Sequence, residues 1–110
     1  MAEASVSETT GVYRDPEPFA LEAQGHSLVF YPGGDDRRRA LMDLVGSATT
    51  TLDICFYIFA EDEVSSELRD ALCAAARGGV AVTLILDSFG ASASDRFLQP
   101  LVDAGGRYFC

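Results

Sequence analysis

Hydrophobic and polar positions follow one another in blocks along the chain, and their spacing changes from block to block. Apolar positions that are consecutive or alternating predict strands, and apolar positions three and four residues apart predict helices. On this basis we expect four strands, at residues 27–31, 50–59, 80–86 and 107–110. Between them we expect three helices, at residues 36–48, 63–77 and 95–104.

The residues between these blocks support the same division. Gly78-Gly79 and Gly105-Gly106 follow the second and third helices, where glycine commonly ends a helix. Asp35 or Asp36 is the expected N-cap of the first helix, and Ser94 is the expected N-cap of the third.

The strands at 50–59 and 80–86 are apolar on both faces, which is typical of a parallel sheet with helices on each side. In the first, Leu52, Ile54, Phe56 and Ile58 share one face, and Cys55, Tyr57 and Phe59 share the other. The pattern therefore predicts an α/β fold of βαβαβαβ order, with a mainly parallel sheet covered by helices. Because three helices are few for two faces, we expect an incompletely covered face or an open edge at Arg107 to Cys110, and self-association there.

Residues 1–25 differ in composition from the rest of the chain. They are polar and acidic, and they include the segment Asp15-Pro16-Glu17-Pro18. Two prolines in three residues exclude a regular helix, so we expect a flexible or extended leader. The α/β domain is expected to occupy residues 26–110.

Charge restricts the class of partner. Eight arginines and no lysine stand against seventeen acidic residues, which gives a net charge of −9. This charge opposes binding to nucleic acid and to anionic lipid head groups, because both need clusters of basic side chains. No apolar run is long enough for a transmembrane segment. The N-terminus carries Glu3 and Glu8 and no apolar signal segment, so we expect a cytoplasmic chain.

Three cysteines, Cys55, Cys73 and Cys110, stand at unrelated spacings. Cys55 and Cys73 lie within apolar runs, so we expect them to be buried, reduced thiols. No pair has the C-x-x-C spacing of a metal site, and we expect no bound metal.

His26 is the only histidine, and Arg37-Arg38-Arg39 is the only basic cluster. A helix N-terminus with guanidinium groups can bind a phosphate. Two aspartates precede the arginines, however, and offset their charge. We therefore interpret the arginines as a solvated first turn and His26 as a structural or exposed side chain.

Acidic side chains follow the two central strands. Glu61 and Asp62 come after the first of them, and Asp87 comes directly after the second. Ligands bind at the carboxyl ends of the strands in an open parallel sheet. These residues, with Tyr57, are therefore the candidate edge of a pocket, although each taken singly is explained by the polar character of loops.

Two of these segments form a less common combination. Tyr57-Ile58-Phe59 is followed by Asp62, and Asp87-Ser88-Phe89-Gly90 ends the next strand. With the helix between them, which stops at Gly78, they make residues 28–110 resemble the opening of a phospholipase D-like domain. In particular, the segment resembles the bacterial cardiolipin synthases. The resemblance implies an incomplete phospholipase D-like domain.

The family that the chain resembles cleaves or exchanges phosphodiesters. Its members use a His-x-Lys-x-x-x-x-Asp element, in which the histidine attacks phosphorus and the lysine holds the phosphate. After His26, the positions of the lysine and the aspartate are held by Leu28 and Gly33. The resemblance therefore carries over no catalytic residue, and it implies no metal or organic cofactor.

Two functions are open at this point. In the first, the chain is the N-terminal part of a phosphatidyltransferase or phosphodiesterase of phospholipid metabolism and is inactive alone. A phospholipid substrate then binds only when the rest of the domain is present, and the full-length protein is cytoplasmic or peripheral to the inner membrane. In the second, the chain is a free-standing, non-catalytic α/β module that binds a partner.

Overall fold

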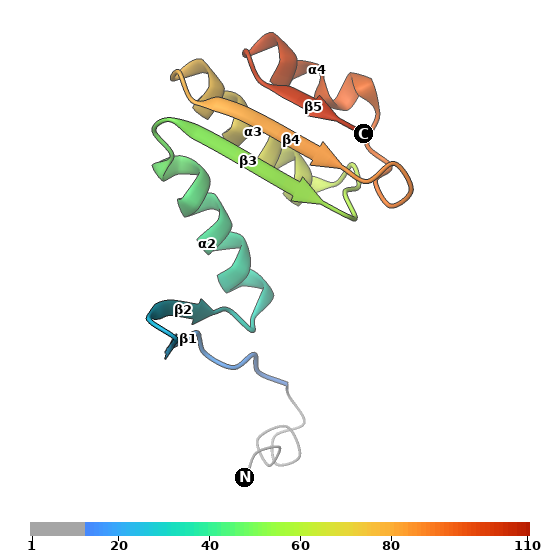
Figure 1. Ribbon diagram of the computed structural model, residues 1–110. Helices are drawn as coiled ribbons and strands as arrows, with labels where there is room; N and C mark the ends of the chain where they lie inside the picture. Colours follow the sequence, from blue (N-terminus) through green and yellow to red (C-terminus); the bar gives the residue numbers. More distant parts are fainter. Residues whose placement is uncertain (1–12) are drawn as a thin grey trace. The chain divides into compact units, whose positions relative to one another are not determined.

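The computed structural model describes residues 13–110, so the first part of the predicted leader lies outside the described residues. The chain divides into two compact units, Met1–Leu41 and Met42–Cys110. The strands and helices in chain order are β1 (Phe19–Ala23), β2 (His26–Phe30), α2 (Gly34–Ser47), β3 (Thr51–Phe56), α3 (Glu63–Arg77), β4 (Ala81–Leu86), α4 (Asp95–Asp103) and β5 (Arg107–Phe109) (Figure 1).

The first unit contains a β-hairpin that the sequence pattern does not predict. β1 and β2 pair antiparallel, from Phe19 opposite Phe30 to Ala23 opposite His26. The two residues between the strands, Gln24 and Gly25, both have positive φ values, of 50° and 81°. Two residues of this kind form the tight turn that suits a two-stranded hairpin.

The hairpin corrects the predicted place of the first strand. β2 pairs with β1 and is not a strand of the parallel sheet, and β1 lies within the segment predicted to be a leader. The rings of Phe19 and Phe30 stack across the hairpin with their centroids 5.2 Å apart. His26 is exposed at the start of β2, next to the turn.

The second unit confirms the predicted α/β alternation. Its sheet has the order β3-β4-β5, and both pairs of neighbouring strands are parallel. Helix α3 leads from β3 to β4, and α4 leads from β4 to β5, so each helix provides the crossover that parallel strands require.

The helix ends follow the local sequence closely. Ser94 is the N-cap of α4, as predicted, and its Oγ accepts a hydrogen bond from the N–H of Phe97 (3.1 Å). Helix α2 begins at Gly34, so Asp35 and Asp36 lie in its first turn and neither is the N-cap. In that turn their negative charge still complements the helix dipole.

Helices α3 and α4 cover one face of the sheet, and the core lies between them and the strands (Figure 1). Alternate residues of each strand point to this face and are buried or half-buried. The most deeply buried side chains of the core are Leu72, Leu84, Leu98, Leu101, Val45 and Cys73. Burial of apolar area of this kind is the main favourable contribution to folding.

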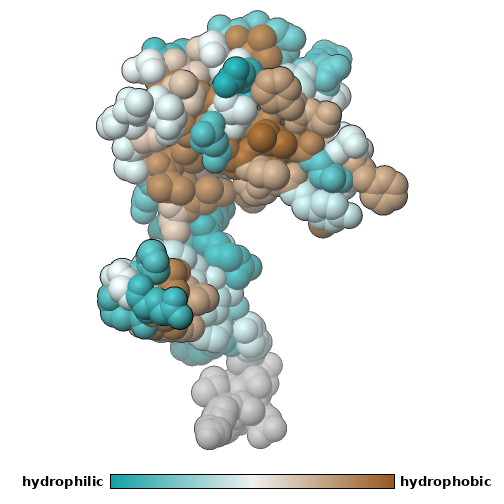
Figure 2. Space-filling view, in the orientation of Figure 1, coloured by the Kyte–Doolittle hydropathy of each residue, from teal (hydrophilic) through white to brown (hydrophobic). Residues whose placement is uncertain are grey.

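The opposite face of the sheet is incompletely covered, which agrees with the first of the two predicted alternatives, an incompletely covered face or an open edge. We call it the open face: Asp53, Cys55, Ile85, Arg107 and Phe109 are exposed on it, and Thr83 belongs to the same face but is buried. In the orientation of Figure 1 this face is turned to the viewer, and Figure 2 shows hydrophobic side chains gathered over the strands there.

The open face corrects the prediction that both central strands are buried on both sides. Cys55 is exposed in β3, and Ile85 in β4 is 45% exposed. Past the end of β3, Tyr57 and Ile58 are exposed as well, and only Phe59 is buried. The apolar pattern of a strand shows that both of its faces are hydrophobic, but it does not show how many covering elements are present.

Candidate functional site

Two loops leave the carboxyl ends of β3 and β4, and backbone hydrogen bonds join them. The N–H of Asp87 donates to the C=O of Phe56 (3.1 Å), and the N–H of Ser92 donates to the C=O of Phe59 (2.9 Å). Phe59 and Ala91 also pair as an isolated parallel bridge. The structure therefore brings together the two segments that hold the candidate pocket-edge residues.

Two of the candidate carboxylates accept hydrogen bonds from nearby backbone. Oδ1 of Asp62 accepts from the N–H of Ser65 (2.8 Å), which makes Asp62 the N-cap of α3. Oδ2 of Asp87 accepts from the N–H groups of Phe89 (2.9 Å) and Gly90 (2.8 Å). Both side chains thus satisfy backbone donors at a helix start and in a turn, which is the ordinary structural use of aspartate in loops.

Of the three candidate carboxylates, Glu61 contacts the residue that is most distant in the sequence. Its Oε2 accepts a hydrogen bond from the N–H of Ser94 (2.7 Å), the residue that caps α4. This bond stabilises the charged carboxylate and lowers the pKa of Glu61. Glu61 therefore stays ionised at neutral pH and holds the first loop against the start of α4.

Tyr57 lies against Gly90, at the junction of the two loops. A Cβ at Gly90 would overlap the backbone O of Tyr57 and lie 3.4 Å from its ring, so only glycine fits there. The Tyr57 side chain itself is 61% exposed, and Phe89 in the neighbouring loop is 92% exposed. The candidate edge thus combines structural carboxylates with exposed aromatic rings.

The arginine cluster is also engaged in local structure. The Nη1 group of Arg37 donates to the C=O groups of Tyr31 (3.2 Å) and Pro32 (2.7 Å). Arg39 forms a salt bridge with Asp36 at 2.7 Å. These contacts support the interpretation of this segment as a helix start whose charges are used by the segment itself.

The cysteines divide into exposed and buried thiols. All three are free; Cys55 and Cys110 are exposed, and Cys73 is buried. The predicted burial of Cys73 is confirmed, whereas that of Cys55 is wrong because Cys55 lies on the open face. Burial raises the pKa of the Cys73 thiol, which keeps it protonated and unreactive at neutral pH.

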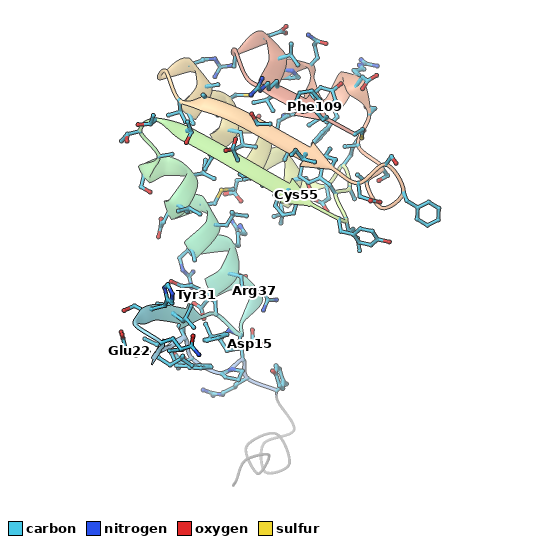
Figure 3. The ribbon with its side chains drawn as sticks, viewed as in Figure 1. Asp15, Glu22, Tyr31, Arg37, Cys55 and Phe109 are labelled. Carbon is cyan, nitrogen blue, oxygen red and sulfur yellow. The ribbon has the colours of Figure 1, made fainter. Side chains whose placement is uncertain are left out.

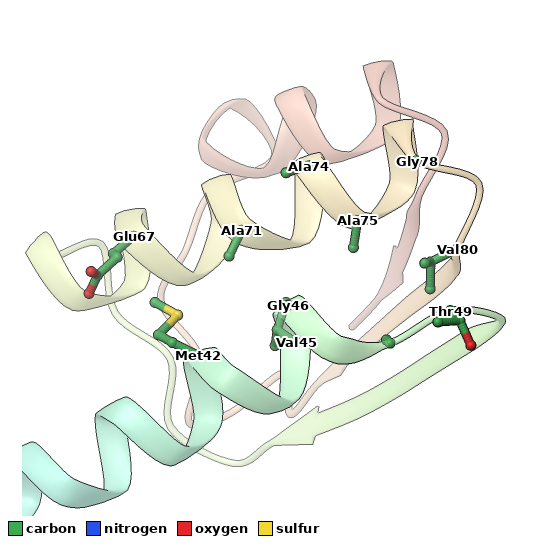
Figure 4. A pocket seen from close by; sticks show the side chains of 11 residues that line it. Met42, Val45, Gly46, Thr49, Glu67, Ala71, Ala74, Ala75, Gly78 and Val80 are labelled. Carbon is green, nitrogen blue, oxygen red and sulfur yellow. The ribbon is translucent and has the colours of Figure 1, made fainter.

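A groove that the sequence pattern does not indicate lies between the last turns of α2 and helix α3 (Figure 4). Its volume is about 640 Å³. Met42 and Val45 form one wall, Thr49 lies at one end and Glu67 at the other. The groove is mainly apolar and offers few groups for chemistry.

The sequence feature that corresponds to this groove is a row of small residues in α3. Ala71, Ala74, Ala75 and Gly78 recur at spacings of three and four residues, which places them on one side of the helix. The apolar spacing along the chain assigns Ala71 and Ala75 to the stripe that faces the core. Small side chains leave space in front of the helix, and this space is the groove.

Residues 13–110 offer neither a metal cluster nor a membrane span. This part of the chain has no group of three or more His, Cys, Asp or Glu side chains that could hold a metal ion. Nor does any helix within it have the length and apolar character needed to cross a bilayer.

Curated proteins with similar sequences include cardiolipin synthases of several bacteria. Cardiolipin synthase 1 of Bacillus anthracis is 34% identical over 73 residues, which are 66% of this chain and 14% of that protein. Cardiolipin synthase B of Escherichia coli (strain K12) is 31% identical over 83 residues, which are 74% of this chain and 20% of that protein. The major cardiolipin synthase ClsA of Bacillus subtilis (strain 168) is 30% identical over 88 residues, or 79% of this chain and 18% of that protein.

The chain therefore spans a small part, 14% to 20%, of the length of these relatives. No protein-family model matches it. The similarity nevertheless covers 66% to 79% of this chain and confirms the resemblance inferred from the sequence. The chain is a cardiolipin synthase-like part of a phospholipase D-like protein.

Proposed function

We propose that this chain forms the front portion of a phospholipase D-like phosphatidyltransferase or phosphodiesterase domain of phospholipid metabolism, and that alone it does not act on phosphodiesters. In the whole protein, the domain works in the cytoplasm or at the surface of the inner membrane. There, the substrate is a phospholipid that binds when the remaining catalytic residues are present.

The similarity to cardiolipin synthases carries the assignment to this kind of domain, and the absence of lysine together with a single histidine carries the expected inactivity. A phosphohistidine mechanism of this family needs one histidine as the nucleophile, a second to protonate the leaving alcohol, and lysines to hold the phosphate. His26 is followed by Leu28 and Gly33 at the positions of the lysine and the aspartate. Even two copies of the chain would supply two histidines without a lysine.

The contacts at the carboxyl ends of the strands support the same proposal. Glu61, Asp62 and Asp87 each accept hydrogen bonds from backbone N–H groups, so they shape the loops at this edge. A general acid or base must instead reach the reacting group of a substrate. These residues therefore act as the frame of a site and leave its chemistry to other residues.

The test is an activity assay on the purified chain with phosphatidylglycerol and with an aryl phosphodiester, followed by trapping for a phosphohistidine. An intact cardiolipin synthase serves as the positive control. We expect no turnover above background and no phosphoprotein. Turnover that is lost in His26→Ala would contradict the proposal.

The alternative function, a non-catalytic α/β module that binds a partner, is favoured by the open face of the sheet. A coding sequence in which a His-x-Lys-x-x-x-x-Asp element follows in frame after residue 110 would support the first function. Binding of a partner by a chain without such an element would support the second.

A further inference from the structure

The open face carries two rows of side chains that run across all three strands. The strand register sets Cys55 beside Ile85 and Ile85 beside Phe109, which forms an apolar row. Figure 3 labels the two ends of this row, Cys55 and Phe109. Ile85 is 45% exposed and Phe109 is 53% exposed. Two residues earlier on each strand, Asp53, Thr83 and Arg107 form a polar row.

The polar row has an acidic end and a basic end. Asp53 is on β3 and Arg107 is on β5, the two edge strands, and Thr83 lies between them on β4. Nε of Arg107 donates to Oγ1 of Thr83 (3.0 Å), which leaves the other guanidinium N–H groups for a further acceptor. Among residues 13–110, the salt bridges are made by other side chains, so Asp53 and Arg107 are not paired as ions.

This arrangement is complementary to itself under one particular rotation. If a second copy is turned by 180° about an axis along β4, its β3 lies over β5 of the first copy. Each Asp53 then faces Arg107 of the other copy, and the two Ile85 side chains meet in the centre. A rotation about an axis across the strands would instead lay β3 over β3 and β5 over β5, so that no Asp53 would face an Arg107 of the other copy.

We infer that the open face is the interface of a symmetric dimer of this chain, with two reciprocal Asp53–Arg107 pairs on either side of an apolar centre of Ile85, Cys55 and Phe109. The two sheets pack face to face with their strands aligned, about 10 Å apart, as sheets do in β-sandwiches. The inference concerns this chain by itself and goes beyond the catalytic role proposed for the whole domain.

The size of the face sets the strength that we expect. Three short strands present less area than the roughly 800 Å² per partner of a standard interface. The dimer is therefore weak and dissociates on dilution, with a dissociation constant of about 10 µM to about 1 mM. The net charge of −9 opposes association at long range, so the contact depends on its local charge pattern.

The experiment uses charge reversal and mixing. Sedimentation velocity of the full chain, with the thiols kept reduced, is measured from well below to well above the expected dissociation constant. Asp53→Arg and Arg107→Asp are measured alone and as an equimolar mixture, and circular dichroism shows that each is folded. Asp103→Arg, an exposed charge reversal on α4, is the matched control.

We expect the wild type and Asp103→Arg to dimerise equally, and each single variant of the open face to bind itself at least about tenfold more weakly. The mixture should dimerise again. In a dimer of the two variants, the arginine that replaces Asp53 in one chain faces the aspartate that replaces Arg107 in the other. The native Arg107 of the first chain likewise faces the native Asp53 of the second chain. The double variant Asp53→Arg, Arg107→Asp carries both exchanged residues in one chain, so it should dimerise with itself.

Three results would overturn the inference. They are a wild type that stays monomeric throughout the concentration range, single variants that dimerise as well as the wild type, and folded single variants that fail to associate when mixed. Should a single variant not fold, the double variant decides by itself, since a folded, monomeric double variant also contradicts the interface.

Discussion

The carboxylate of Glu61 accepts a hydrogen bond of 2.7 Å from the backbone N–H of Ser94, which lies 33 residues later in the chain. Ser94 is also the N-cap of α4, so one bond ties the loop after β3 to the start of a helix that follows β4. This contact between residues distant in the sequence holds the loop after β3 in place at the carboxyl edge of the sheet. It also lowers the pKa of Glu61, which makes it measurable.

We expect the backbone amide of Ser94 to report the titration of Glu61. Because the hydrogen bond lowers the pKa in the folded state, the stability that it contributes is present above the unfolded-state pKa and is lost as the pH falls through the folded-state pKa. NMR titration of labelled protein should give a midpoint at Ser94 below the ordinary glutamate value. Glu61→Gln should abolish this titration, and a midpoint at or above the ordinary value would contradict the contact.

Replacement of Gly90 by alanine should destabilise the protein. The added Cβ would overlap the backbone O of Tyr57, so the two joined loops must move apart. We expect a cost of about 1–3 kcal/mol in the free energy of unfolding, measured with urea. Gly46→Ala is the control: nothing lies within 4 Å of its Cβ, and within α2 it should stabilise by about 0.5–1 kcal/mol. Equal effects at the two positions would show that the loops are not packed as described.

Truncation of Leu84 to alanine tests the covered side of the sheet. The Leu84 side chain is fully buried, and its removal should cost about 2–5 kcal/mol through lost burial and a residual cavity. Its neighbour Ile85 is 45% exposed on the open face, so Ile85→Ala should cost well under half as much in dilute protein. Denaturant midpoints measure both, and a larger loss at Ile85 would mean that the faces are assigned the wrong way round.

The three thiols should react at two very different rates. Cys55 and Cys110 are exposed and should be alkylated quickly by iodoacetamide at mildly alkaline pH. Cys73 is buried, its pKa is raised by that burial, and it should react only when the protein opens. Peptide mapping by mass spectrometry identifies the labelled sites, with denatured protein as the control for full labelling. Rapid labelling of Cys73 in the native protein would contradict its place in the core.

The helices illustrate how far local sequence information reaches. The spacing of apolar residues and the glycines after Arg77 predict the helix at residues 63–77, and α3 has these bounds. Ser94 is likewise predicted and observed as an N-cap. Both features depend on residues within one or two turns of each other, so a single stretch of sequence contains the necessary information.

The candidate site was predictable only in part. The position of Glu61, Asp62 and Asp87 just beyond the strands follows from the order of strands and loops. What each carboxylate binds does not, because the partner of Glu61 is reached only when β3 and β4 lie side by side. The groove beside α3 was missed for a related reason, since small residues leave a space only where a second helix stands opposite them.

Local sequence is enough to predict the alternation of strands and helices, to show the family resemblance in the segments after β3 and β4, and to show the lack of lysine for phosphate chemistry. These are properties of neighbouring residues and of composition. Three features follow from contacts between distant segments: β2 pairs with β1, Cys55 and Ile85 lie on the open face, and Asp53 and Arg107 stand at opposite ends of one row. Burial and pairing depend on which distant elements cover each face, and the sequence around an apolar side chain is the same whether or not a covering element is present.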